Sequence, residues 1–164
     1  MSVCFSGGAL GSDTIWTEVA NYYGHDVINY IFDGHKSTCS GLVVLTDNEL
    51  TVADDYLKKA NSIVQRRFPT KSKTTNSLLR RNYYQIKDSD SCYAVSSISD
   101  NKISGGTAWA VAMFIQNRPN KPVFILNQDD LLWYYYDYNI SQYIICDSLP
   151  PTPSGNWTGI GTRD

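Results

Sequence analysis

A glycine-rich turn near the N-terminus constrains the fold of this chain more than any other stretch. The apolar run Val3-Cys4-Phe5 leads into Ser6-Gly7-Gly8-Ala9-Leu10-Gly11-Ser12-Asp13, and a segment with helical spacing follows. A strand that breaks at glycines and restarts as a helix leaves unpaired backbone N–H groups at the positive end of the helix dipole. Glycines also let a ligand approach closely, and Ser6 and Ser12 add hydroxyls. The turn therefore predicts a phosphate site. The simpler alternative is a turn in which Ser12 or Asp13 is only the helix N-cap.

A second turn of the same kind occurs in the last third of the chain. The run Ser104-Gly105-Gly106-Thr107-Ala108-Trp109 also lies between an expected strand and an expected helix. Two such turns in one parallel sheet put two helix N-termini at the same edge, where a ligand with a phosphate and a ribose, or with two phosphates, fits between them. Neither turn has the Gly-Lys-Ser/Thr ending of a P-loop or the full GxGxxG pattern. The repetition favours ligand binding over two ordinary N-caps.

Strands and helices are expected to alternate along the chain. We expect strands at 2–6, 27–32, 92–98, 123–126 and 143–146, helices at 13–23, 48–67, 77–87 and 107–116, and irregular segments at 33–47 and 70–76. The type of the aromatic stretch 131–138 is left open. The tail 148–164 has three prolines and three glycines and is expected to be a loop packed on the body. The alternation predicts a single α/β domain, 1–164, with a Rossmann-like, doubly wound and mainly parallel sheet.

Composition limits the partners of the chain. Its net charge of −2 gives no general attraction to nucleic acid. The four cysteines form no CxxC pair and no His/Cys cluster, so we expect no metal, no cofactor and no disulfide framework. No apolar run approaches the roughly 20 residues of a membrane span, and the N-terminus lacks a basic segment followed by an apolar one. We therefore expect a cytoplasmic protein without a membrane partner.

Five short motifs, the first extended by Trp16, together resemble a known superfamily. They are Ser6 to Asp13 with Trp16, Phe32-Asp33-Gly34-His35, Arg80-Arg81-Asn82-Tyr83-Tyr84-Gln85, Gly105-Gly106-Thr107-Ala108-Trp109-Ala110-Val111 and Thr158-Gly159-Ile160-Gly161-Thr162-Arg163. Spread over nearly the whole chain, they look like a phage and bacterial branch of the SLOG superfamily, which is similar to DNA-processing protein A and the LOG proteins. The resemblance implies a Rossmann-like domain that binds nucleotides or nucleotide-derived signals in a bacterial cell or a phage-infected host. Some members cleave nucleoside monophosphates, some sense ADP-ribose-type cyclic signals and some aid recombination on single-stranded DNA.

One departure from the family pattern concerns catalysis. Phosphoribohydrolases of the LOG type carry a Pro-Gly-Gly-x-Gly-Thr-x-x-Glu turn, but the matching stretch here, 104–112, contains no Glu. Cleaving an N-glycosidic bond needs an anionic group near the positively charged, oxocarbenium-like centre. We therefore expect binding without cleavage and no catalytic residue. Asp13, Glu18 and Asp100 are the carboxylates that can replace the missing Glu, which keeps a hydrolase open.

Side chains outside the turns complete the predicted site. Arg81 can bind a phosphate through two hydrogen bonds, with Asn82 and Gln85 beside it, although a solvated helix face is the alternative. His35 can contact phosphate or ribose or be a structural histidine. Trp109, Trp16 and Trp133 can stack on an adenine, although core packing is the commoner role. Arg163 can fold over the site or a neighbouring subunit's site, with a disordered end as the alternative. The predicted ligand-binding set is Ser6, Gly7, Gly8, Ala9, Gly11, Ser12, Asp13, His35, Arg81, Asn82, Gln85, Ser104, Gly105, Gly106, Thr107, Trp109 and Arg163.

Three functions follow from these patterns. The first is capture of a nucleotide or a nucleotide-derived signal, such as a host immune signal of the cyclic ADP-ribose or cyclic-nucleotide kind held by a phage protein. The second is an N-glycosidase or phosphoribohydrolase of the LOG type. The third is a recombination accessory that binds single-stranded DNA along a basic cluster, formed by Arg66, Arg67, Lys71, Lys73, Arg80 and Arg81. Such a cluster is more often a solvated face, so nucleic acid is not the partner we expect. The supply of aromatic residues favours a homo-oligomer.

Overall fold

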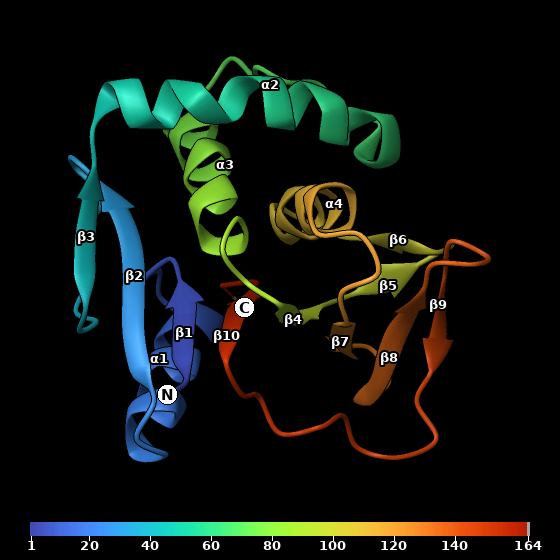
Figure 1. Ribbon diagram of the computed structural model, residues 1–164. Coiled ribbons are helices and arrows are strands. Elements are labelled where there is room, and N and C mark those ends of the chain that lie inside the picture. Colours follow the sequence, from blue (N-terminus) through green and yellow to red (C-terminus); the bar gives the residue numbers. More distant parts are fainter. Residues whose placement is uncertain (164) are drawn as a thin grey trace.

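Ten strands and four helices follow one another within residues 1–163, which the computed structural model describes (Figure 1). The strands are β1 (Val3–Ser6), β2 (Asp26–Phe32), β3 (Leu42–Leu45), β4 (Ser91–Ser96), β5 (Ile98–Ser99), β6 (Lys102–Ile103), β7 (Val123–Asn127), β8 (Leu132–Asp137), β9 (Gln142–Ile145) and β10 (Asn156–Gly161). The helices are α1 (Ser12–Tyr22), α2 (Asp47–Val64), α3 (Lys73–Ile86) and α4 (Thr107–Asn117). This alternation confirms the predicted α/β fold.

Eight of the strands form one sheet in the order β3-β2-β1-β10-β4-β7-β8-β9. The pairs from β3 to β7 are parallel, whereas β8 and β9 add two antiparallel strands at one edge. The two remaining strands, β5 and β6, form a separate hairpin. The sheet is therefore mainly parallel, as the sequence predicts for a Rossmann-like fold.

The helices cover the two faces of the sheet unequally (Figure 1). The connection from β1 through α1 to β2 runs in one direction along the sheet, and the connection from β4 through α4 to β7 runs in the other. Right-handed crossovers place the two helices on opposite faces. Helix α3 lies beside α4, and α2 packs across both as an outer layer. One face thus has three helices and the other has α1.

The apolar character of α4 is explained by its place between two layers. All residues from Thr107 to Ile115 are buried, since one side of the helix packs on the sheet and the other packs against α2 and α3. A helix that is apolar all round must be covered all round. Helix α2, by contrast, buries only one stripe, formed by Leu50, Ala53, Leu57, Ala60 and Val64.

The expected loop at the C-terminus is wrong for Asn156–Gly161. This segment is β10, which lies in the middle of the sheet between β1 and β4. The Ser6 hydroxyl donates to the Gly159 carbonyl at 2.6 Å, and the Thr158 hydroxyl donates to the Phe5 carbonyl at 3.0 Å. A Cβ on Gly159 would lie 2.5 Å from the Trp16 ring, so a glycine is needed where the indole packs on the strand. The glycines that made this segment resemble a loop lie where side chains of other segments pack on the strand.

Two other segments differ from expectation, and the structure assigns a third whose type was open. The stretch 33–47 was expected to be irregular but contains β3 at the sheet edge. Helix α3 begins at Lys73 rather than at residue 77, because the Ser72 hydroxyl accepts from the Thr75 N–H and caps it. The aromatic stretch, whose type the sequence left open, is β8.

The state of the cysteines and the length of the helices bear on the predictions made from composition. All four cysteines are free, and Cys4 and Cys92 are buried. None of the helices in the described part of the chain combines the length and the apolar character that crossing a bilayer requires.

Candidate functional site

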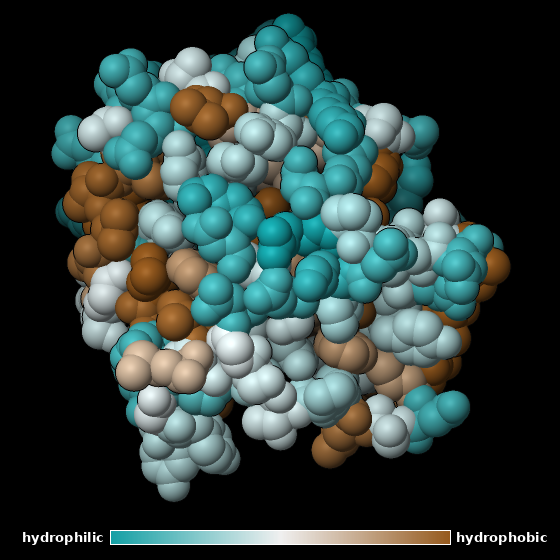
Figure 2. All heavy atoms as spheres, in the orientation of Figure 1, coloured by the Kyte–Doolittle hydropathy of each residue, from teal (hydrophilic) through white to brown (hydrophobic). Residues whose placement is uncertain are grey.

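A cleft of about 540 Å³ opens at the carboxyl edge of the parallel strands. It lies between α3, the start of α4 and the ends of β1 and β10, and Figure 2 shows hydrophilic residues gathered at the centre of the view, in the region where these elements meet in Figure 1. Its walls are Ala9, Asp13, Thr75, Leu78, Leu79, Arg81, Asn82, Gln85, Ser97, Ser104, Gly105, Gly106, Thr107, Ala110, Gln128, Ile160, Gly161, Thr162 and Arg163. This edge, where the crossovers leave in opposite directions, is the usual ligand site of open α/β sheets.

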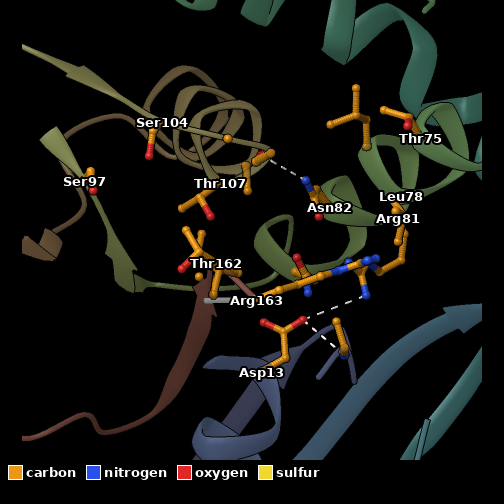
Figure 3. A pocket seen from close by; sticks show the side chains of 18 of the residues that line it. Asp13, Thr75, Leu78, Arg81, Asn82, Ser97, Ser104, Thr107, Thr162 and Arg163 are labelled. Carbon is orange, nitrogen blue, oxygen red and sulfur yellow. Dashed lines mark hydrogen bonds and ion pairs between the residues drawn. The ribbon is translucent and has the colours of Figure 1, made fainter. Parts of the chain in front are cut away.

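The chain leaving β10 enters the cleft because β10 stands between β1 and β4. The Thr162 N–H donates to the Val95 carbonyl at 3.1 Å, and the Thr162 carbonyl accepts from the Ser12 N–H at 3.2 Å. A Cβ on Gly11, whose φ is 95°, would lie 2.7 Å from the Arg163 Cα. Backbone contacts on both sides thus hold Thr162 and Arg163 over the start of α1, with their side chains at the cleft (Figure 3).

A buried arginine and aspartate form the floor of the cleft. Arg81 is 5% exposed, its Nη1 donates to the Gly7 carbonyl, and this nitrogen lies 3.9 Å from Asp13 Oδ2. Asp13 also accepts from the Ala9 N–H at 3.3 Å. Burial raises the pKa of Asp13, which the Arg81 charge partly opposes, and burial lowers the pKa of Arg81. The buried Arg81 Nε has no hydrogen-bond partner among residues 1–163. An unpaired cationic N–H of this kind favours an anionic ligand.

The second glycine turn presents the start of α4 to the cleft. Its carbonyls are already bound, since Arg66 donates to Gly105 at 2.8 Å and Asn82 donates to Gly106 at 3.3 Å. No side chain in the described part of the chain caps α4, whereas α2 and α3 have capping residues. The first N–H groups of a helix have no intrahelical partner and point out of its N-terminus. Gly105, Gly106 and Thr107 therefore offer an uncapped helix N-terminus to a ligand.

The first glycine turn has a different role. Its Gly8 N–H donates to Asn29 Oδ1 at 2.9 Å, its Ala9 N–H donates to Asp13, and the Ser12 N–H donates to Thr162. These three amides, expected to cradle a phosphate, already have partners within the protein. The turn joins β1, β2 and β10 and presents Asp13, while the second turn and the arginines offer the anion contacts.

Ten of the seventeen predicted site residues line the cleft. These are Ala9, Asp13, Arg81, Asn82, Gln85, Ser104, Gly105, Gly106, Thr107 and Arg163. The seven that do not line it are Ser6, Gly7, Gly8, Gly11, Ser12, His35 and Trp109. Trp109 is 3% exposed and packs in the core near Phe68. Gly7 lies against the cleft wall, where a Cβ would meet the side chains of Arg81 and Gln85, whereas a Cβ on Gly8 would meet Ser37.

Nine wall residues were missed by the sequence analysis. They are Thr75, Leu78, Leu79, Ser97, Ala110, Gln128, Ile160, Gly161 and Thr162. Gln128 closely follows the strand expected at 123–126, and Thr162 adjoins Arg163, so these two positions had a signal. Ser97 had none, because it fell inside the strand expected at 92–98, whereas β4 ends at Ser96. Thr75 was missed because α3 was expected to begin at residue 77, four residues after its observed start at Lys73.

The carboxylates considered for catalysis lie in different places. Asp13 lines the cleft, whereas Glu18 is exposed on α1 and Asp100 lines a separate hollow near β5 and β6. Counting from Gly106-Thr107, the family Glu corresponds to Ala110, which is a cleft wall; counting from Ser104, it corresponds to Ala112, which faces the other hollow. Either count gives an alanine. Within residues 1–163, no group of three or more His, Cys, Asp or Glu is placed to hold a metal ion.

Three of the six cations in the basic cluster contact other groups of the protein or are buried. Arg66 binds the carbonyls of Ile103 and Gly105, Arg80 pairs with Asp54 at 2.6 Å, and Arg81 is buried. A groove that follows a nucleic-acid backbone needs a row of accessible cations. The cluster is therefore not a continuous basic surface.

His35 is expected to remain neutral well below pH 6. Its ring stacks on Phe32 with centroids 5.1 Å apart, and its Nδ1 is buried without a hydrogen-bond partner among the described residues. Burial, then the charges of Arg81 and Arg163, lower its pKa to about 4. Because this pKa is below the unfolded value of about 6.5, the contribution of His35 to stability is present above pH 6.5 and is lost as the pH falls toward 4.

Titration by NMR measures this pKa directly. A His35→Gln variant identifies the resonance, and a titration midpoint near 6.5 would contradict the desolvation of this half-buried ring. An anion that binds beside Arg81 and Arg163 would offset their charges and is therefore expected to raise the His35 midpoint.

Comparisons with protein-family models, curated proteins and solved structures gave no significant match to this chain. A proposal of function for this chain therefore rests on the residues of the cleft.

Proposed function

We propose that the cleft binds a nucleotide or a nucleotide-derived signalling molecule through its phosphate. The observation that carries this proposal is the pairing of two anion-seeking features on one cleft. Among the described residues, Arg81 has a buried Nε without a partner, and the N-terminus of α4, which no side chain of those residues caps, contributes Gly106 and Thr107 to the walls. Arg163 adds a second cation, so the charges of the wall residues sum to +1 with Asp13 included. A phosphate matches both the charge and the hydrogen-bond donors.

The remaining walls suit the other parts of a nucleotide. Hydroxyls from Thr75, Ser97, Ser104, Thr107 and Thr162 and amides from Asn82, Gln85 and Gln128 can bind ribose and base edges. Leu78, Leu79, Ala110 and Ile160 provide apolar surface for a base. A volume of about 540 Å³ is within the range of roughly 300–1,000 Å³ that small-molecule sites occupy.

The cleft is better suited to holding a ligand intact than to cleaving the ligand. Asp13 is the one carboxylate among the wall residues, and it is engaged by Arg81 and the Ala9 N–H. A carboxylate neutralised by an arginine stabilises a developing positive charge poorly. Combined with the resemblance to phage SLOG proteins, this supports sequestration of a host immune signal of the cyclic ADP-ribose or cyclic-nucleotide type. The hydrolase remains a second candidate because Asp13 faces the cleft with a raised pKa, as a general acid requires.

One experiment separates these functions. The purified protein is mixed with nucleoside monophosphates, cyclic nucleotides, cyclic ADP-ribose and a single-stranded oligonucleotide; binding is measured by calorimetry, and the released compounds are identified by mass spectrometry. Recovery of an intact small ligand after denaturation supports capture. Release of free base that disappears in Asp13→Asn assigns a hydrolase. Salt-sensitive binding of the oligonucleotide alone would rule out both.

Gly106→Asp is expected to weaken binding of the tightest ligand in the panel by about 10- to 100-fold, or about 1.4–2.7 kcal/mol. The new carboxylate lies at the N-terminus of α4 and repels the phosphate. A Cβ at this position lies 3.8 Å from the nearest atom, a Leu79 methyl carbon, and Gly106 has helical backbone angles, so the fold is kept. Calorimetry measures the affinity.

Gly106→Ala is the matched control for this prediction. It adds the same Cβ without the charge and is expected to bind within about threefold of the wild-type protein, since a Cβ here meets only ordinary van der Waals contact. Equal binding by the aspartate variant would remove the second turn from the ligand site.

A further inference from the structure

Within the described residues, no helix covers part of the sheet on one of its faces. On the side of α1, that helix covers β1, β2 and β10. Beyond it, towards the β9 edge, the proline-rich segment 147–155 crosses the sheet, held by the Tyr93 hydroxyl, which donates to the Pro151 carbonyl at 2.7 Å (Figure 1). Parallel strands are normally buried on both faces.

The two faces of this part of the sheet differ in burial. On the α4 side, Cys92, Ala94, Val123 and Ile125 are at most 1% exposed. On the α1 side, strand register places Leu126 opposite Trp133 and Phe124 opposite Tyr135. Tyr93 on this side is buried, but Val95, Phe124, Leu126, Trp133 and Ile144 are only half-buried, and Tyr135 is 37% exposed. We call this surface the open face; it consists of Val95, Phe124, Leu126, Trp133, Tyr135 and Ile144.

Helix α1 carries an exposed apolar stripe next to the open face. Ile15, Val19, Tyr22 and the adjoining Tyr23 are 59%, 43%, 83% and 71% exposed, at helical spacing. Leu149 on the proline-rich segment is 81% exposed. The helix contains no Lys or Arg, and Glu18 is its one exposed charge. Interface cores are depleted of charge in this way.

An apolar hollow of about 460 Å³ separates the stripe from the open face. Its walls include Trp16, Tyr93, Trp133 and Trp157 as well as Leu149. The Trp16 indole N–H donates to the Ile160 carbonyl at 3.1 Å, and the Trp157 indole N–H donates to His25 at 3.0 Å. Both indole N–H groups already donate to acceptors within the chain. An apolar partner can therefore cover the rings without leaving these donors unpaired.

We propose that a second copy of this chain docks on this surface, with the α1 stripe and Leu149 of each copy packed on the open face of the other. Protruding side chains and a hollow lie on the same face, which is the arrangement that a two-fold axis makes self-complementary. Each copy then supplies the helix layer that its partner lacks.

The available area supports this occupant. Covering Tyr22 and Tyr23 alone removes on the order of 300 Å² from water. Ile15, Val19, Leu149 and the half-buried rings of the open face extend the surface towards the roughly 800 Å² per partner of a stable interface. This dimer is independent of the proposed nucleotide site, which opens at the carboxyl edge of the sheet.

A second apolar surface lies at the other edge of the sheet and serves as the competing arm of the test. Leu42, Val43 and Val44 on β3 are 43%, 41% and 59% exposed, and Figure 2 shows hydrophobic residues gathered over this edge on the left of the view. An unpaired apolar edge strand can pair with another strand. It is only four residues long, and its last residue, Leu45, is buried.

Sedimentation of the full chain from about 1 to 200 µM tests the proposal, a range that covers micromolar dissociation constants. The wild-type protein is expected to reach twice the 18.4 kDa mass of one chain. Val19→Lys and Leu149→Lys are each expected to weaken the dimer at least tenfold. Both positions are exposed, and a lysine in the last turn of α1 complements the helix dipole, so the monomer stays folded.

Val52→Lys is the matched control, since Val52 is 54% exposed on α2, and it is expected to leave the dimer unchanged. A wild-type mass of one chain at every concentration overturns the proposal. So does a dimer that both α1-face variants leave intact, and so does a dimer that Val44→Lys, on β3, dissociates in their place.

Discussion

A chain that ends at Gly155 is expected to lose cooperative folding altogether. The deletion removes β10, so β1 and β4, which meet only through β10, each lose a neighbouring strand. It also removes Trp157 and Ile160, each 2% exposed. Emptying one such core site typically costs about 2–5 kcal/mol, and a whole domain has a stability of only about 5–15 kcal/mol. Urea unfolding followed by circular dichroism should show no cooperative transition.

Lengthening the chain without removing the strand provides the control. Insertion of Gly-Ser-Gly-Ser after Ser154, an exposed position, keeps β10 and costs little because loop-closure entropy grows slowly with length. This variant is expected to unfold cooperatively near the wild-type midpoint. A truncated chain with the wild-type midpoint would show that β10 contributes nothing to the fold.

The same strand shows where sequence patterns stop being informative. The strands and helices that carry their own periodicity, such as β1, α1, β2 and α4, lie within a few residues of their expected ends. For β10 the pattern failed because Gly159 and Gly161 leave room for the side chains of Trp16 and Ser12, which belong to another segment. A glycine required by a distant neighbour looks the same in sequence as one in a loop.

The residues of the candidate site likewise include some that sequence patterns could indicate and some that they could not. Local residue types could indicate the second glycine turn and Arg81, which line the cleft, whereas of the first turn only Ala9 and Asp13 do so. The internal use of the first turn could not be predicted, since its Gly8 N–H is taken by Asn29 on β2. Ser97, Gln128 and Thr162 come from the ends of three strands that only the sheet order brings together.

Arg81→Met is expected to lower the free energy of unfolding at pH 7 by about 3–5 kcal/mol, the usual effect of removing one partner from a buried ion pair. Asp13 is then left buried without its cation, and the Gly7 carbonyl loses its donor. Asp13 already has a raised pKa in the folded protein, and the substitution raises it further. The protonated form is favoured on folding, so the stability that it contributes is present below the unfolded pKa of about 3.8 and is lost as the pH rises through the folded pKa. The deficit of the variant should therefore shrink between pH 7 and pH 4.5.

The double variant Arg81→Met/Asp13→Asn separates the lost charge pair from lost packing. An asparagine oxygen can still accept from the Ala9 N–H, 3.3 Å from the carboxylate, and no buried charge remains unpaired. We expect urea unfolding to return most of the lost stability, as is common when both partners of a buried pair become neutral. The restored fold should nevertheless bind the phosphate ligand that we propose at least tenfold more weakly, because Arg81 supplies the buried cation of the cleft. A double variant no more stable than Arg81→Met would show that the arginine acts through packing. A stable double variant with wild-type affinity would show that the ligand is held by Arg163 and the start of α4 without Arg81.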